Sequence, residues 1–410
     1  MKLQASPAPL PANLCALQRG GACVMMGSME TRERKIGLKA VYTLCPVAHT
    51  VALLSVVVIL LHLALRDSQP LMARVGSGFL HPMHEKLALL CDKLGYYSAA
   101  EALIWGFIVF LLAALIWRLV KLIRGDRWRN LYRLIMLPIS AALFVYAGYS
   151  ALWGTYYYAD DFLATGGFES REIAVDELET VTKYFAARLN ELGDAVQRDE
   201  QGFYILDRHD ILDRSREIYN NTEALHPRLS GPAVSAKAIA SSHWLSYLDF
   251  TGFFFPFTGE ACVNTDFPVS LFPSTVAHEL AHQRGVAREQ DANFVAVLSS
   301  LESGDLDYGY SACLLAYIHL GNALYSADYA RWEPIYKSLS REVRLDMALN
   351  NAYWQQFETP VQTVSNTVHE GLLQSYDQEL GLKSYGACVD LLVCHYLNDA
   401  QAYFSAEKTD

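Results

Sequence analysis

The chain has 410 residues, of which 52% are hydrophobic, 12% aromatic and 19% charged. This composition excludes a disordered or low-complexity protein, because the apolar side chains are numerous enough to form a core. A net charge of −11 argues against a basic nucleic-acid-binding protein. By length alone the chain has room for two or three domains.

Charge divides the chain in two. Residues 1–153 carry 16 Lys and Arg against 7 Asp and Glu, a net charge of +9, whereas residues 154–410 carry 17 against 37, a net charge of −20. We expect residues 1–36 to be a disordered extension, because residues 1–28 are rich in Pro, Ala and Gly without periodicity, and Met29 resembles a more natural start. A membrane anchor over 37–153 and an acidic domain over 154–410 would follow.

Three apolar stretches explain the first part: residues 41–65, 100–120 and 134–153. Each provides about the 20 residues that a helix needs to cross the hydrocarbon core of a bilayer. Three such stretches in succession favour membrane spans over buried helices of a soluble protein. A transport pathway is disfavoured, because the spans contain almost no ionisable residues beyond His49, His62 and Glu101.

Lys and Arg predict the orientation of these spans. Six cations lie between the second and third spans, and four more precede the first span: Arg118, Lys121, Arg124, Arg127, Arg129 and Arg133, then Arg32, Arg34, Lys35 and Lys39. Because cytoplasmic loops are enriched in Lys and Arg, the N-terminus is expected in the cytoplasm. An odd number of spans then predicts an extracytoplasmic C-terminal domain, anchored in the cell membrane as a multi-pass protein.

Helical periodicity dominates residues 154–410, so the predicted fold class is mainly α, with a small strand element whose best candidate lies within residues 232–258. The expected helices cover residues 169–192, 211–225, 274–284, 289–303, 308–324, 335–353, 363–376 and 385–397. The eight cysteines contain no CxxC pair, which argues against a zinc ribbon or a thioredoxin-like site. Buried free thiols are favoured over disulfides, although the spacing leaves both open.

The main chemical motif is HExxH at residues 278–282. On a helix the imidazoles of His278 and His282 share one face, so both can bind one Zn²⁺, while Glu279 can act as general base on a water molecule. Gly285 follows where the chain must turn sharply. The pattern is weak alone, and the alternative is a solvated helix face.

A catalytic zinc site needs a third protein ligand. Residue 288, where metzincins have a histidine, is Arg288, so Glu289 is the preferred ligand and Asp291 the competitor. The alternative for Glu289 is an acid placed at a helix N-terminus by the helix dipole.

Two blocks, residues 256–266 and residues 278–294, closely resemble a family of bacterial membrane proteins catalogued as domain of unknown function 3810. The late motif of residues 384–386 with 389–392 also matches, and the resemblance covers roughly residues 37–400. It implies three N-terminal spans and an outer HExxH domain with a zincin-like fold. It implies no substrate.

The string from Glu289 to Asn293 also resembles the Glu-x-x-Ala-Asp pattern of gluzincin peptidases. That resemblance implies Glu289 as the third metal ligand and Asn293 in place of the carboxylate that orients a histidine. An amide oxygen can still accept a hydrogen bond from an imidazole but adds no charge.

Two further residues are candidates. Glu260 would lie near the metal if residues 253–263 form the edge strand that lines a zincin-like cleft; the equal alternative is an exposed acid at a glycine turn. Tyr385 could donate a hydrogen bond to the oxyanion. Four histidines compete with Tyr385 for that role: His243, His319, His369 and His395.

The sequence therefore predicts a membrane-anchored, zinc-dependent hydrolase, a metallopeptidase of gluzincin type, that acts on a peptide or protein at the outer membrane surface. Its partners would be the lipid bilayer and that substrate, with no nucleic acid. The alternative is a membrane-anchored binding or sensor module with a structural or non-catalytic metal site.

Overall fold

The computed structural model describes residues 41–125, 127–159, 162–378 and 388–406. The chain divides into two units, residues 1–43 and residues 44–410, and all elements described below belong to the second unit. The fold is mainly helical with one small sheet, as the periodicity predicts. The predicted disordered extension lies outside the described residues.

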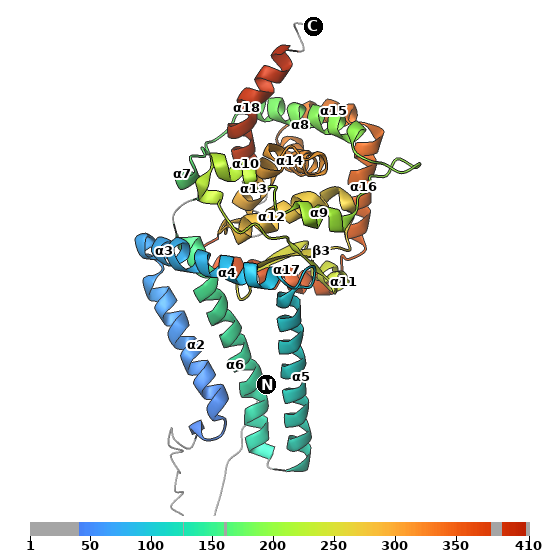
Figure 1. Cartoon of the computed structure of the whole chain (residues 1–410). Helices are drawn as coiled ribbons and strands as arrows, with labels where there is room; N and C mark the ends of the chain where they lie inside the picture. Colours follow the sequence, from blue (N-terminus) through green and yellow to red (C-terminus); the bar gives the residue numbers. More distant parts are fainter. Residues whose placement is uncertain (1–40, 126, 160–161, 379–387, 407–410) are drawn as a thin grey trace, which may run out of the picture. The chain divides into compact units, whose positions relative to one another are not determined.

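Three helices are long and apolar enough to cross a membrane, which indicates membrane association. They are α2 (Pro46–Leu65), α5 (Ala99–Arg124) and α6 (Arg127–Leu152), and Figure 1 shows them side by side. Helix α6 begins at Arg127, seven residues before the apolar stretch predicted to be the third span. The cations assigned to a cytoplasmic loop therefore lie in the last turns of α5 and the first turns of α6.

The segment between the first two spans is helical rather than a loop. It forms α3 (Gln69–Val75), η1 (Gly76–Leu80) and α4 (His81–Asp92), which cross the ends of the three long helices (Figure 1). Ser98 then begins helix α5, its side chain accepting a hydrogen bond from the amide of Glu101.

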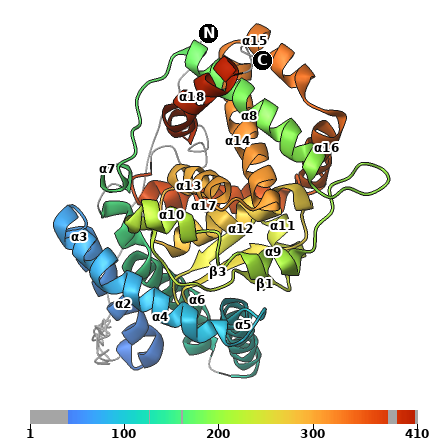
Figure 2. The same cartoon turned by 45° about the horizontal axis from the view of Figure 1, so that its top comes forward.

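The remaining helices surround a buried core in residues 154–410. They are η2 (Gly154–Tyr158), α7 (Phe162–Gly166), α8 (Val175–Ala195), α9 (Arg208–Arg214), α10 (Asn220–Leu225), η3 (Pro227–Leu229), α11 (Ser242–Tyr247), η4 (Val269–Leu271), α12 (Phe272–Gln283), α13 (Glu289–Glu302), α14 (Leu306–Ala327), α15 (Tyr329–Ser338), α16 (Arg341–Gln355), α17 (Pro360–Ser375) and α18 (Cys388–Ala406). Helix α12 packs between the sheet and helices α13 and α14 (Figure 2).

Two of the predicted helices are each divided into two shorter helices in the structure. The segment 211–225 is divided between α9 and α10, and the segment 335–353 between α15 and α16. In the second case Ser340 starts a new helix, because its side chain accepts a hydrogen bond from the amide of Val343. Apolar periodicity continues across such a break, so the pattern alone does not reveal it.

The predicted strand at 253–263 is a hairpin. Strands β2 (Gly252–Phe255) and β3 (Glu260–Asn264) pair antiparallel, and β1 (Lys237–Ile239) pairs parallel with β3, giving the order β1-β3-β2. Gly259, with φ of 70°, lies directly before β3. Strand β2 is therefore an edge strand of this sheet.

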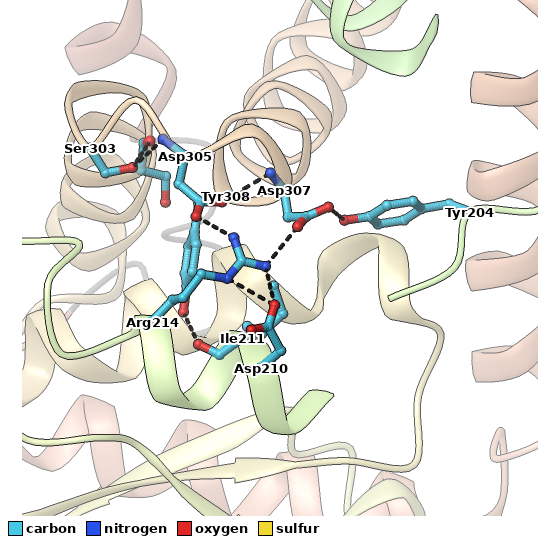
Figure 3. A network of polar contacts seen from close by, with 9 residues as sticks. Tyr204, Asp210, Ile211, Arg214, Ser303, Asp305, Asp307 and Tyr308 are labelled. Atoms are coloured by element: carbon cyan, nitrogen blue, oxygen red, sulfur yellow. Dashed lines mark hydrogen bonds and ion pairs between the residues drawn. The ribbon is translucent and has the colours of Figure 1, made fainter. Parts of the chain in front are cut away.

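A polar network fixes helix α9 to the start of helix α14 (Figure 3). The guanidinium of Arg214 bonds Asp305 and, at 2.7 Å, Asp307. Asp307 also accepts from Tyr204 at 2.7 Å, while Tyr308 donates to the carbonyl of Ile211 at 2.8 Å. These contacts hold the N-terminus of α14, which packs against α12.

Direct contacts also join the long helices to the rest of the unit, across the boundary expected between residues 153 and 154. The ring of Phe257 fills the space beside Gly148 of α6, where an added Cβ would lie 2.5 Å from that ring. Ser150 and Tyr376 share a hydrogen bond of 2.7 Å. The long helices and the helical domain therefore lie within one compact unit.

Candidate metal centre

The motif histidines lie on one face of helix α12. The rings of His278 and His282 have centroids 4.6 Å apart and planes at 90°. Pro273 occupies the first turn of α12, where its fixed φ suits the helix and its missing N–H is no loss. At the other end Gly285 adopts a φ of 80° and turns the chain toward α13, as the sequence predicts.

Glu289, the first residue of α13, faces both histidines. Its carboxylate oxygens lie 3.2 Å from Nε2 of His278 and 3.6 Å from Nε2 of His282. One potential ligand atom from each of the three side chains lies within 4.8 Å of the others. Burial raises the pKa of the Glu289 carboxyl, but His282 and His278 outweigh this effect and hold that pKa well below its usual range.

The other ring nitrogens are held by oxygen atoms. Nδ1 of His278 lies 2.9 Å from Oδ1 of Asn293, and Nδ1 of His282 lies 2.7 Å from the carbonyl oxygen of Val286. A carbonyl oxygen can only accept, so Nδ1 of His282 carries a proton, and Nε2 of each ring is the nitrogen that faces the Glu289 carboxylate. Asn293 thus lies where the gluzincin resemblance implies a residue that orients a histidine.

Glu279 is a buried carboxyl beside this cluster. Its side chain is 3% exposed, and Oε2 has no hydrogen-bond partner among the described residues. Burial raises the pKa of Glu279 to about 7. A buried carboxyl without a partner destabilises the fold, so such groups concentrate at functional sites.

Strand β2 runs directly over Glu279. A Cβ added at Gly252 would lie 2.5 Å from Oε1 of Glu279, closer than real contacts allow. Gly252 is therefore required for the close approach of the edge strand to the carboxyl.

The cluster opens into a cavity of about 600 Å³, a volume typical of ligand sites. Its walls come from strand β2, from the end of α6 and from α17. The lining residues outside the cluster include Tyr149, Trp153, Tyr157, Thr251, Asn366, His369 and Leu372. A second cavity of about 340 Å³ shares Thr251, His278 and Trp354 with the first, so open space lies on both sides of His278.

Glu260 does not join the cluster, so the expectation of a cleft residue is corrected. Its carboxylate is buried and accepts hydrogen bonds from the amides of Ala99 and Ala100 and from Oγ1 of Thr258. These contacts direct the Glu260 side chain toward the start of α5 rather than toward α12. It is neither a metal neighbour nor an exposed acid.

Asp291 is buried on α13 but lies outside the group formed by His278, His282 and Glu289. Its charge acts instead on Cys388, where burial first and then Asp291 raise the pKa of the thiol. The geometry thus favours Glu289 over Asp291 as the third ligand. The described cysteines are free: Cys45, Cys91, Cys262, Cys313, Cys388 and Cys394.

Tyr385 lies outside the described residues. Among its four competitors, His369 lines the larger cavity and His319 the smaller one. His243 bonds Asp266 at 2.7 Å, and His395 packs against the ring of Phe294. Burial lowers the pKa of His369, so this imidazole is neutral near pH 7.

Trp153 is a site residue that sequence reasoning missed. Its ring packs edge-on against His282, with centroids 5.7 Å apart at 86°. The sequence shows only an aromatic run, residues 153–158, at the end of a span, which is typical of a membrane interface. No spacing relates this run to the motif, so only the fold reveals the contact.

A family model described as "Protein of unknown function (DUF3810)" matches residues 87–393, more than half of the chain. The match includes the described metal cluster, the sheet and most of the surrounding helices. No curated protein and no solved structure matches the chain.

Proposed function

We propose that this chain, which belongs to the DUF3810 family, is a membrane-anchored zinc-dependent hydrolase that cleaves peptide bonds at the outer membrane surface. One observation carries the proposal. Nε2 of His278 and Nε2 of His282 converge on the Glu289 carboxylate, while the buried Glu279 beside them has no described partner for Oε2.

The donor set fits a catalytic zinc ion. Two imidazole nitrogens and one carboxylate oxygen are three ligands of the kinds that zinc takes, which leaves a fourth position for water or substrate. When bound, zinc would supply a Lewis acid that polarises a carbonyl and makes water more acidic. Asn293 and Val286 would keep both rings oriented toward the ion.

Glu279 would move the proton. Its Oε2 would take a proton from the attacking water as the oxygen–carbon bond forms, and would return it to the leaving amine nitrogen as the carbon–nitrogen bond breaks. A base works best with a pKa near the working pH, and burial raises the pKa of Glu279 to about 7. Oε2 of Glu279, which has no hydrogen-bond partner among the described residues, is free to hold this proton.

The walls of the cavity favour an extended polypeptide as the substrate. Strand β2 is at the edge of the sheet and lines the cavity from Thr251 to Phe254. An edge strand can pair with a further strand through backbone hydrogen bonds. His369 projects into the same cavity from α17 and is the described candidate to contact the scissile carbonyl.

The proposed orientation rests on the cations at the junction of α5 and α6. A protease added outside intact cells should cleave the chain between residues 162 and 406. A reporter fused at residue 300 should report the extracytoplasmic side. Activity of that fusion in the cytoplasm would contradict the proposed orientation, and with it a substrate at the outer membrane surface.

Hydrolysis is tested with the purified full-length protein and a library of peptides. Glu279→Gln should lower cleavage by about 10²–10⁴-fold, because it removes the base while preserving size. Glu333→Gln is the matched control, because Glu333 is a surface residue paired only with Lys337 in the described contacts. Bound zinc without cleavage by the wild-type protein would favour a binding or sensor module.

A further inference from the structure

Helix α17 carries an exposed apolar stripe on the side away from the cavity. Val361, Val364 and Val368 are 53%, 64% and 67% exposed and follow the i, i+3, i+7 spacing of one helix face. Gly371 continues this face, which therefore bears no charge. A neighbouring face is polar and carries Thr363, Thr367 and Gln374.

Both ends of α17 are fixed at the outer turns of the long helices. At the C-terminal end, Tyr146 of α6 donates to Ser375 at 3.4 Å, and Ser150 bonds Tyr376 at 2.7 Å. Toward the N-terminal end, Ser365 donates to the carbonyl of Leu248 at 2.8 Å. Leu248 directly follows α11, whose preceding residue Ser241 accepts from Trp105 of α5 at 3.1 Å.

These contacts place α17 beside the ends of α5 and α6 that adjoin the helical domain (Figure 1). Exposed apolar side chains also lie on α11 and directly after it: Trp244 is 64% exposed and Leu248 is 38% exposed. Tryptophan is enriched at the membrane–water boundary, where its ring suits the headgroup layer. Exposed apolar side chains beside two candidate membrane spans favour a bilayer as the neighbour of this surface.

We propose that α17 lies in the headgroup layer with Val361, Val364 and Val368 in contact with lipid. Its inner face supplies Asn366, His369 and Leu372 to the cavity at the metal cluster. One helix then contacts the bilayer on one side and lines the candidate site on the other. If the proposed hydrolase function holds, its substrates are polypeptides held in the bilayer by a lipid or a span.

Lipid contact is measured on the full chain in vesicles of phosphatidylethanolamine and phosphatidylglycerol. An environment-sensitive fluorescent amino acid is introduced by codon suppression at 364 or 368, and at 363 or 367 on the polar face as matched controls. The fluorescence of probes at 364 and 368 should shift to shorter wavelength and should be quenched by a nitroxide-labelled lipid. The fluorescence of probes at 363 and 367 should instead be quenched by aqueous iodide. Equal behaviour at all four positions overturns the proposal.

A second pair of variants guards against a distorted helix. With the probe at 361, Val364→Asp with Val368→Asp should abolish quenching by the nitroxide lipid, and Thr363→Asp with Thr367→Asp should leave it unchanged. Loss in both pairs, or in neither, overturns the lipid contact. The readout needs neither zinc nor cleavage, so its failure is separate from failure of the proposed function.

Discussion

Glu260 and Glu101 join helix α5 to the small sheet in opposite directions, each carboxylate accepting from two backbone amides. The Glu260 carboxylate of β3 accepts from the amides of Ala99 and Ala100 at the start of α5, at 3.1 and 2.6 Å. Glu101, one turn into α5, accepts from the amides of Ala240 and Ser241 after β1, at 2.9 and 2.8 Å. This exchange fixes the sheet that lines the cavity to a helix long enough to span a membrane.

Glu260→Ala should lower stability without removing the metal. The change leaves two amides at the start of α5 without their acceptor, which costs about 1–3 kcal/mol when such groups are buried. Zinc content should match the wild type, because Glu260 lies outside the cluster. The thermal midpoint in detergent and the bound zinc are measured together, with Glu333→Ala as the exposed control. Loss of zinc at unchanged stability would indicate that Glu260 contributes to metal binding in the cleft.

Zinc affinity should fall in a set order across the cluster variants. His278→Ala and Glu289→Gln each remove a ligand and should abolish tight binding, whereas Asn293→Ala should weaken it roughly 10–100-fold through the lost hydrogen bond to His278. Asp291→Asn should bind zinc like the wild type. Competition with a chelator gives these affinities, and a greater loss in Asp291→Asn than in Glu289→Gln would identify a different third ligand.

Gly252→Ala should impair turnover while zinc stays bound. The added Cβ would overlap Oε1 of Glu279, so either the carboxyl or strand β2 must move. Gly309→Ala is the control, because a Cβ there would meet its nearest neighbour, Leu192, at an ordinary 3.7 Å. Peptide cleavage and zinc content are compared for both variants. A Gly252→Ala protein with wild-type turnover would show that β2 does not set the position of Glu279.

Stability should fall as the pH drops from 6.5 to about 4, in part through His84. Burial and the nearby His81 lower the pKa of His84 to about 4. Between these pH values His84 is protonated in the unfolded chain but remains neutral in the folded protein. The free energy of unfolding therefore falls by up to roughly 3 kcal/mol. His84→Gln removes the titrating group and should flatten that part of the profile, measured as the thermal midpoint against pH. Parallel profiles for both proteins would contradict the assignment to His84.

The local part of the site could be predicted from the sequence. The spacing of His278 and His282, the turn at Gly285 and the carboxylate of Glu289 lie within one short stretch, where helix geometry decides which side chains meet. The same holds for the apolar helices, because their length and composition are local properties.

The rest depends on contacts between distant segments. Glu260 has the same sequence surroundings whether it faces the metal cluster or the amide of Ala100, and only the packing of α5 against the sheet decides between them. Trp153 reaches His282 because α6 ends beneath α12, and His369 reaches the cavity because α17 is bonded to the ends of the long helices. No sequence spacing predicts these contacts between distant segments.

Glu279 is proposed to transfer a proton during hydrolysis and to take no part in metal binding. The most direct measurement compares cleaved N-termini in membrane proteomes from cells that carry the wild-type chain or Glu279→Gln at equal levels, with zinc content and thermal midpoint determined on the same two proteins. We expect equal zinc content, equal or higher stability in the variant, and fragments cut on the outer side of the membrane in wild-type cells alone. Identical fragments in both cells, with zinc equally bound, would contradict it.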